Sequence, residues 1–249
     1  VSRPKVSLPP QEAFISNISV KGATLFPQKE IETIIAGYRN KKITGQQMQA
    51  CADAVTEIYS RKGYITSYAY ILPEKIGQGV LEIMVVEGRI GKIEINPGRY
   101  FSAKLIKKRV GLKEGDFLNL YTLKQDIYRL NKHTDLKVHF DFRQEQDSGL
   151  TDIIFTAEDK LPLHVTCEAD SYGSQNILYN RYKTYLVHNN ISGHDDSVTI
   201  KAQITEADTH KLADLDYFIP INENWKFEFY IMPYKLEDYE CGTNVDTDF

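Results

Sequence analysis

Hydrophobic residues near the start of the chain change their spacing several times. Ile18 and Val20 alternate with polar residues, as in a half-buried strand, whereas Ile31 and Ile35 lie one helical turn apart. Thr44 begins a second helical pattern as the first residue of a capping box. The pattern predicts, in order, a strand at 14–26, a helix that begins at Pro27, a helix from Thr44 to Gly63, and a hairpin of strands at 65–71 and 80–86.

The same order of elements repeats about 75 residues later. In the second copy Ile93 stands where Ile18 stands in the first, and a second hairpin is predicted from strands at 138–142 and 151–156. Only residues 87–89 separate the two copies, so we expect a stiff junction between two small modules. Each module must bury two helices against a three-stranded sheet, which predicts an α+β fold with tandem β-α-α-β-β modules.

The helical period disappears after Leu161, where apolar and polar residues alternate strictly. Strands of about 9–11 residues with one apolar face and with Tyr or Trp near their ends are typical of transmembrane β-barrels. A soluble antiparallel sandwich alternates in the same way and stays an alternative. A closed barrel needs about eight strands or more, so these could only be its first strands. Five strands are predicted, at 163–170, 181–191, 197–205, 211–221 and 225–234.

Charge divides the chain at the same place. The 249 residues have a net charge of −4, but residues 161–249 alone hold 6 basic and 15 acidic side chains. A net negative chain offers no general basic surface for nucleic acid.

No apolar run is long enough for a membrane-spanning helix, and we expect any export signal to have been removed upstream of Val1. The predicted parts are a proline-bearing linker at 1–12, modules at 13–88 and 89–160, and a strand domain at 161–249.

Residues that could carry chemistry are sparse. The three cysteines, Cys51, Cys167 and Cys241, lie far apart, which predicts neither a zinc cluster nor a disulfide framework. The sequence contains no H-E-x-x-H, no G-x-S-x-G and no phosphate-binding glycine loop, so we expect neither enzyme activity nor a cofactor.

Two charged clusters have a second, simpler interpretation. A metal site could be built at residues 188–196, but Asn189, Asn190 and Gly193 favour a polar hairpin turn there. A basic cluster near residue 107 could meet phosphates or an acidic client, although a solvated helix face is more common. The metal candidates are His188, His194, Asp195 and Asp196, and the basic cluster is Lys104, Lys107, Lys108 and Arg109.

The strongest candidate for function is a sheet edge. In each module the first hairpin strand should lie at the edge of the sheet, where unpaired N–H and C=O groups can add a client strand. The strand at 138–142 is the weaker candidate of the two. In the first module the predicted client-binding residues are Ile65, Thr66, Ser67, Tyr68, Ala69, Tyr70 and Ile71.

Side chains along this strand should divide between its two faces. Ile65, Ala69 and Ile71 should face the helices, which leaves Tyr68 and Tyr70 beside the edge as anchors for a client. The alternative is that the two tyrosines only pair across the hairpin, with neighbours that include Glu82 and Met84.

Several segments resemble a known family. FISNISVKGATLFPQKEI, YSRKGYITSYAYI and GVLEIMVVEGRIGKIEI resemble a polypeptide-transport-associated (POTRA) domain, namely the first one of the two-partner secretion transporters, the haemolysin secretion/activation family. RLNKHTDLKVHF and SGLTDIIFTAEDKLPLHV are similar to the second POTRA domain where it enters the barrel. DSYGSQ, LVHNNISGHDDSV and DYFIP resemble the first barrel strands. Two loops depart from the family: RQEQDSG lacks a proline-glycine pair, and Tyr172 stands where an asparagine is more usual nearby.

The resemblance implies an outer-membrane transporter for two-partner (type V) secretion in a Gram-negative-type bacterium. Residues 1–160 would lie in the periplasm, and residues 161–249 would be the N-terminal part of a β-barrel surrounded by outer-membrane lipid. It also implies that the first POTRA domain captures an unfolded secreted partner protein. The family's plug helix and later barrel strands are missing, so the chain resembles an internal fragment. Two alternatives stay open: an outer-membrane protein insertion factor of the same superfamily, and a soluble binding protein with a C-terminal β-sandwich.

Overall fold

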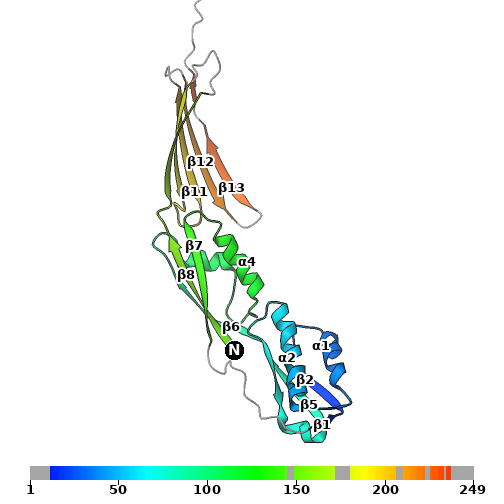
Figure 1. The fold of residues 1–249 in the computed structure, drawn as a ribbon. Coiled ribbons are helices and arrows are strands. Elements are labelled where there is room, and N and C mark those ends of the chain that lie inside the picture. The colour runs from blue at the N-terminus through cyan, green and yellow to red at the C-terminus, as the bar shows by residue number, and fades with distance from the viewer. Residues whose placement is uncertain are drawn as a thin grey trace, which may run out of the picture. The chain divides into compact units, whose positions relative to one another are not determined.

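The computed structural model divides into two compact units, one formed by residues 1–98 and 106–158 and the other by residues 99–105 and 159–249 (Figure 1). No helix within the described ranges is long and apolar enough to cross a membrane. The structure describes residues 12–144, 149–171, 180–205, 210–221, 225–232 and 234–236. Four sequence features lie wholly or largely outside these ranges: the linker at 1–12, the loop at 143–149, Tyr172 and Cys241.

The first module packs two helices on a three-stranded sheet of order β2-β5-β4. Strand β2 runs parallel to β5, and β4 runs antiparallel to it. Its elements are β1 (Ala13–Ile15), β2 (Asn17–Lys21), α1 (Gln28–Ile35), the short 3₁₀ helix η1 (Ala36–Tyr38), β3 (Lys41–Ile43), α2 (Gly45–Arg61), β4 (Tyr68–Leu72), the 3₁₀ helix η2 (Pro73–Gln78) and β5 (Val80–Val86).

Two local predictions for this module were wrong. The single strand expected at 14–26 is two short strands, because Ser16 donates from its amide and its hydroxyl to Gly79 O and breaks the run. Strand β1 pairs with β3 and leaves the main sheet to β2. The first helix begins at Gln28, so that Pro27 precedes it in an extended conformation rather than forming its first turn.

Helix α2 supplies most of the helical side of the first core. The capping box predicted at its start is confirmed: Thr44 Oγ1 accepts from the Gln47 amide (3.3 Å), and the Thr44 amide donates to Gln47 Oε1 (2.9 Å). Full burial of a large apolar side chain contributes about 1.5–3 kcal/mol, so Met48, Val55 and Tyr59 make a substantial contribution to the stability of the module. The buried residues of α2 are Met48, Cys51, Ala52, Val55, Thr56 and Tyr59.

The second module repeats the first. Its sheet has the order β6-β8-β7, again with its first strand parallel to the central one. The bridge between Arg89 and Phe117 corresponds to the pairing of Phe14 with Lys42 in the first module. Its elements are β6 (Arg89–Asn96), α3 (Ala103–Val110), α4 (Leu120–Leu130), β7 (Leu136–Gln144) and β8 (Leu150–Asp159).

The second unit is dominated by an antiparallel sheet of order β13-β12-β11-β10-β9. Its strands are β9 (Leu163–Asp170), β10 (Arg181–Asn189), β11 (Ser197–Thr205), β12 (His210–Pro220), β13 (Lys226–Ile231) and β14 (Tyr234–Leu236), and four of the five predicted strands agree to within two residues. The fifth was predicted as one strand at 225–234 but forms two, β13 and β14, which both pair with β12. Pro233 lies between them in the sequence and cannot donate to a ladder.

We expect Thr44→Ala to destabilise the start of α2 by about 1 kcal/mol, because the side chain that accepts from the third helical amide is lost. Faster amide exchange at the first turn of α2, measured by mass spectrometry, would report it. Thr33→Ala is the matched control, since the Thr33 hydroxyl donates to Lys29 O inside α1 and caps nothing. Equal exchange in both variants would contradict the prediction.

Candidate functional site

Strand β4 forms an edge of the first sheet, as predicted, but it is shorter than expected. It begins at Tyr68, and residues 65–67 form the turn that follows α2. Ile65 was predicted to face the helices, yet its side chain is 39% exposed because the chain is still reversing direction there. Ala69 and Ile71 are fully buried on the helix side, as expected.

Tyr68 and Tyr70 lie half-buried on the opposite face of β4. Their ring centroids are 6.2 Å apart, and their partners across the hairpin are Val86 and Met84, respectively. The predicted pairing with Met84 is therefore present, whereas Glu82 lies opposite Leu72 rather than a tyrosine. Both rings keep exposed surface beside the edge.

The backbone of β4 is only partly available for pairing. The Ala69 amide donates to Thr56 Oγ1 (2.9 Å) of helix α2, so this N–H points away from β5. In an antiparallel ladder the N–H and C=O of one residue face the same side, and alternate residues face the same edge. The outward groups left for another strand are therefore the C=O of Ala69 and both backbone groups of Ile71.

Thr66 and Ser67 belong to the junction of the modules rather than to the edge. Ser67 Oγ accepts from the Gly88 amide (2.9 Å). A Cβ on Gly88 would lie 2.1 Å from Thr66 Oγ1, so only glycine fits there. These two predicted client-binding residues fix the start of β4 against the segment that leads into the second module.

Glu87 holds the other side of this junction. Its carboxylate accepts from the amides of Thr24 (2.7 Å) and Leu25 (2.8 Å), from the Thr24 hydroxyl, and from the Tyr59 hydroxyl (2.8 Å). Burial alone would raise the pKa of Glu87, but these hydrogen bonds outweigh it and hold that pKa below its usual value. Burial, together with the bond and charge of Glu87, raises the pKa of Tyr59.

The C-terminus of α2 meets the N-terminus of α4. Three consecutive carbonyls there accept hydrogen bonds from the second module: Arg61 O from the Tyr121 hydroxyl (3.2 Å), Lys62 O from Asn119 Nδ2 (3.0 Å), and Gly63 O from the Leu120 amide (2.8 Å). Sequence reasoning missed this contact. Asn119, which also caps α4 through its Oδ1, was the available signal.

The edges of the second module are largely occupied by its own chain. At β7, Asn131 Oδ1 accepts from the Val138 amide (2.7 Å) while Asn131 Nδ2 donates to Val138 O (3.1 Å). This carboxamide takes both backbone groups that a client strand would need at Val138. The strand predicted at 138–142 as the weaker candidate is therefore blocked at its first residue.

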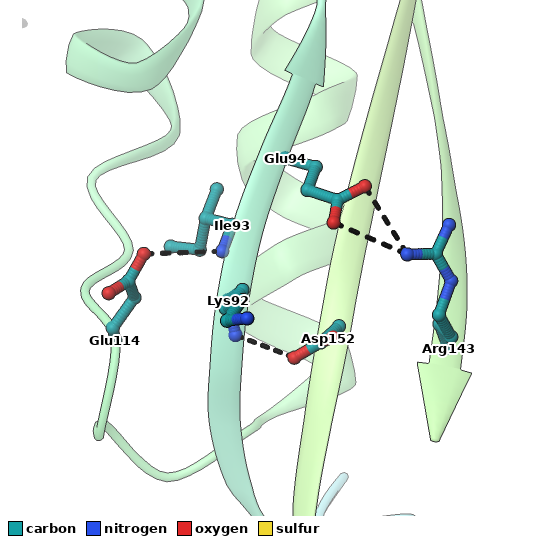
Figure 2. Close-up of polar contacts among 6 residues, drawn as sticks. All are labelled: Lys92, Ile93, Glu94, Glu114, Arg143 and Asp152. Atoms are coloured by element: carbon teal, nitrogen blue, oxygen red, sulfur yellow. Dashed lines mark hydrogen bonds and ion pairs between the residues drawn. The ribbon is translucent and has the colours of Figure 1, made fainter. Parts of the chain in front are cut away.

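The edge at β6 is closed by side chains and by a neighbouring loop. Figure 2 shows the Ile93 amide donating to Glu114 Oε1 (3.4 Å) at this edge, whereas on the opposite side of β6 the Lys92 amide donates to Asp152 Oδ1 (2.6 Å) of the neighbouring strand β8. Near the start of β6, the Ile90 amide donates to Asp116 O and Ile90 O accepts from the Gly115 amide, both at 2.8 Å. A register irregularity between Ile90 and Ile93 disrupts the ladder further.

The sheet from β9 to β13 has two chemically different faces. Register places the apolar residues of alternating positions on one face, and most of them are exposed. The other face is charged, with ion pairs from Asp170 to Arg181 (2.7 Å) and Lys183 (2.6 Å) and from Lys201 to Asp214 (3.3 Å). The apolar face includes Leu163, Val165, Cys167, Ala169, Leu186, Ile200, Ala202, Ile204, Leu215, Phe227, Phe229 and Ile231.

The metal candidates lie where the simpler interpretation placed them, at a hairpin turn. Asp196 is fully buried and accepts from the Ser192 amide (3.0 Å) and the Tyr217 hydroxyl (2.8 Å), so its carboxylate closes the turn. Asn190 and Asp195 adopt positive φ angles. No group of three or more His, Cys, Asp and Glu side chains in the described part of the chain is placed to hold a metal ion.

The basic cluster lies along α3. Lys104, Lys107 and Lys108 are exposed there and Arg109 is half-buried, the arrangement of a solvated helix face. Of the cysteines, Cys51 is buried and Cys167 is exposed, and both are free thiols.

Residues 13–88 match the model of the POTRA domain, ShlB-type. The first module is a ShlB-type POTRA domain. The outer membrane transporter CdiB of Escherichia coli O6:K15:H31 is 29% identical over 183 residues, covering 74% of this chain and 31% of the relative. The hemolysin transporter protein ShlB of Serratia marcescens is 27% identical over 161 residues, covering 65% of this chain and 28% of the relative. The chain is therefore similar to an outer membrane transporter and a hemolysin transporter, and it spans only about a third of their length.

The fold agrees with this relationship. The solved structure of CdiB from Escherichia coli matches 92% of this chain and 47% of its own, with a TM-score of 0.66 and 22% sequence identity. The CdiB relative is named an outer membrane transporter. The α+β POTRA module followed by antiparallel strands, predicted from sequence, is confirmed.

We expect Glu87→Gln to lower the free energy of unfolding by about 1 kcal/mol at pH 7, because a half-buried, charge-assisted hydrogen-bond acceptor is lost. Because the pKa of Glu87 is held below the ordinary 4.5, this contribution is present above that value and is lost as the pH falls through the folded-state pKa. Urea unfolding should therefore separate wild type and variant at pH 7 and bring their free energies of unfolding together as the pH falls below the folded-state pKa of Glu87.

Glu57→Gln is the matched control, since Glu57 forms an exposed ion pair with Arg61 on the same helix. If the free energies of unfolding of wild type and Glu87→Gln still differ at low pH, the difference does not come from the ionised carboxylate of Glu87, and the prediction is contradicted.

Proposed function

We propose that this chain is part of an outer-membrane transporter that receives an unfolded secreted partner protein in the periplasm and passes it to a β-barrel. The two modules form the receiving side, and the strands from β9 to β13 begin the barrel wall. The relationship to CdiB and ShlB supports the transporter class and speaks against an enzyme. Capture at a sheet edge is the further step of the proposal.

The observation that carries the proposal is the exposed apolar face of the β9–β13 sheet. In a soluble sandwich this face would pack on a second sheet at a distance of about 10 Å. Within the described residues no second sheet covers it. A barrel wall has the arrangement seen here, with apolar side chains toward lipid and charged side chains toward the lumen.

Strand β4 is the proposed point of capture. An extended client segment could pair with the outward groups of Ala69 and Ile71, while the exposed surface of Tyr68 and Tyr70 supports its side chains. Each backbone hydrogen bond contributes only about 0.5–1.5 kcal/mol net, so a pairing of this size is weak enough to release the client. An insertion factor would use the same edge, and the client would decide between the two: a secreted partner or a barrel precursor.

We expect Ile200→Lys to reduce the share of chain that floats with phospholipid vesicles, because a charge on the lipid face of a barrel costs about 2–4 kcal/mol near mid-bilayer. Thr199→Lys is the matched control: its side chain lies on the charged face, across from Asp216. Equal losses in both variants, or a wild-type chain that stays monomeric in water without detergent, would favour the sandwich.

We expect the double variant Tyr68→Ala and Tyr70→Ala to weaken binding of the urea-unfolded secreted partner about tenfold or more, as for aromatic anchors at other interfaces. A photo-crosslinking phenylalanine analogue at position 70 should attach to the partner. The same analogue at Tyr128, which is 66% exposed on α4, should not. Equal crosslinking at both positions would rule out β4 as the point of capture.

A further inference from the structure

A groove of about 340 Å³ lies along the other edge of the first sheet, between β2 and α1. Strand β2 has β5 on one side, and no described strand pairs with its other side. Figure 1 shows α1 next to β2 at this end of the module. The groove is lined by Asn17, Ile18, Ser19 and Val20 of β2, by Ala23, and by Gln28, Ile31, Glu32, Ile35 and Arg39 on and after α1.

The backbone of β2 presents a hydrogen-bond donor to this groove. The Ile18 amide donates to Asn17 Oδ1 (2.9 Å), so it is not used in the ladder with β5. Asn17 itself is exposed, and its side chain can leave at little cost. Since alternate residues of a strand face the same edge, Val20 presents its backbone groups on the same side. At Ile18 the edge is therefore covered by the exposed side chain of Asn17 and not by another strand.

The second module provides the comparison. Ile93 is the residue equivalent to Ile18, but its amide donates to a carboxylate, Glu114 Oε1, from the loop between α3 and α4 (Figure 2). The same loop pairs with Ile90 through Gly115 and Asp116, just as β3 and Asn40 pair with Ile15 in the first module. The two modules therefore differ farther along this edge, where a carboxylate from the loop binds the Ile93 amide in the second module and only the Asn17 side chain binds the Ile18 amide in the first.

We propose that the β2–α1 groove binds a second extended segment of the unfolded exported polypeptide, which adds to β2 as a strand. The inference rests on the proposed function for the nature of the client, but it concerns the edge opposite β4. A helix, about 10 Å across, would not bring its backbone to the donors of β2 because its own groups are already paired. An extended chain offers acceptors at the right spacing and apolar side chains for the floor, where Ile31 and Ile35 are buried.

The segment that precedes β1 in this chain is a poorer occupant. Its sequence, VSRPKVSLPPQ, contains three prolines, which lack the N–H that a ladder requires.

Two client-binding edges on one module would also affect how the client is held and released. One segment stays bound while the other exchanges, and the linked segments bind more tightly than either alone.

The test uses the full chain and a synthetic peptide of alternating valine and threonine with lysine at each end. A photo-crosslinking phenylalanine analogue replaces Gln28, which is exposed on α1 at the groove, and Thr33, exposed on α1 but outside the groove, is the control position. We expect crosslinking to the peptide at 28 and not at 33. Val20→Pro removes an outward N–H at an edge, where proline is tolerated, and should lower the yield at 28 about tenfold.

Asn17→Ala keeps the inference falsifiable if the proline variant misfolds, because it should act in the opposite direction. It frees the Ile18 amide and should raise the yield at 28 several-fold. An unchanged yield in Asn17→Ala, or equal yields at 28 and 33, would overturn the inference. The analogue at position 70 separates the outcomes: crosslinking there but not at 28 refutes only the second site, whereas none at either position also refutes strand capture at β4.

Discussion

The N–H and C=O groups at the edge of a β-sheet must find partners, and this constraint governs both modules. The first module satisfies it incompletely: a threonine takes one donor of β4, and an asparagine takes one donor of β2. The second module satisfies it with the carboxamide of Asn131 and with the loop around Glu114. The two repeats share one topology, and they differ in how much of each edge is left for another chain.

The strands of the second unit also pair their backbone groups, but their side chains divide between an apolar face and a charged face. Every residue pair from β9 to β12 continues the ladder, while alternating side chains separate apolar from charged surface. Ion pairs such as Lys201 with Asp214 gather on one face, where charged groups can compensate each other. Such a sheet is suited to the boundary between two environments, which is why its exposed apolar face carries the proposed function.

Elements that depend on local pattern could be predicted from the sequence. The capping box of Thr44 and the alternation after Leu161 each specify their structure within a few residues, and the hairpin pattern located the edge strand β4. Predictions failed where a distant group decides the outcome. Gly79 O ends the first strand at Ser16, and the turn after α2 delays β4 until Tyr68. The partners of Ala69 and Val138 are side chains that no periodicity reveals.

The contact between α2 and α4 has an electrostatic consequence of its own. The carbonyl end of one helix carries a partial negative charge of about half an elementary charge, and the amide end of the other carries the opposite. Because Gly63 O meets the Leu120 amide, the two macrodipoles are joined head to tail across the module boundary. This attraction involves no titratable side chain, so acidification that would neutralise a carboxylate leaves the alignment of the helices in place.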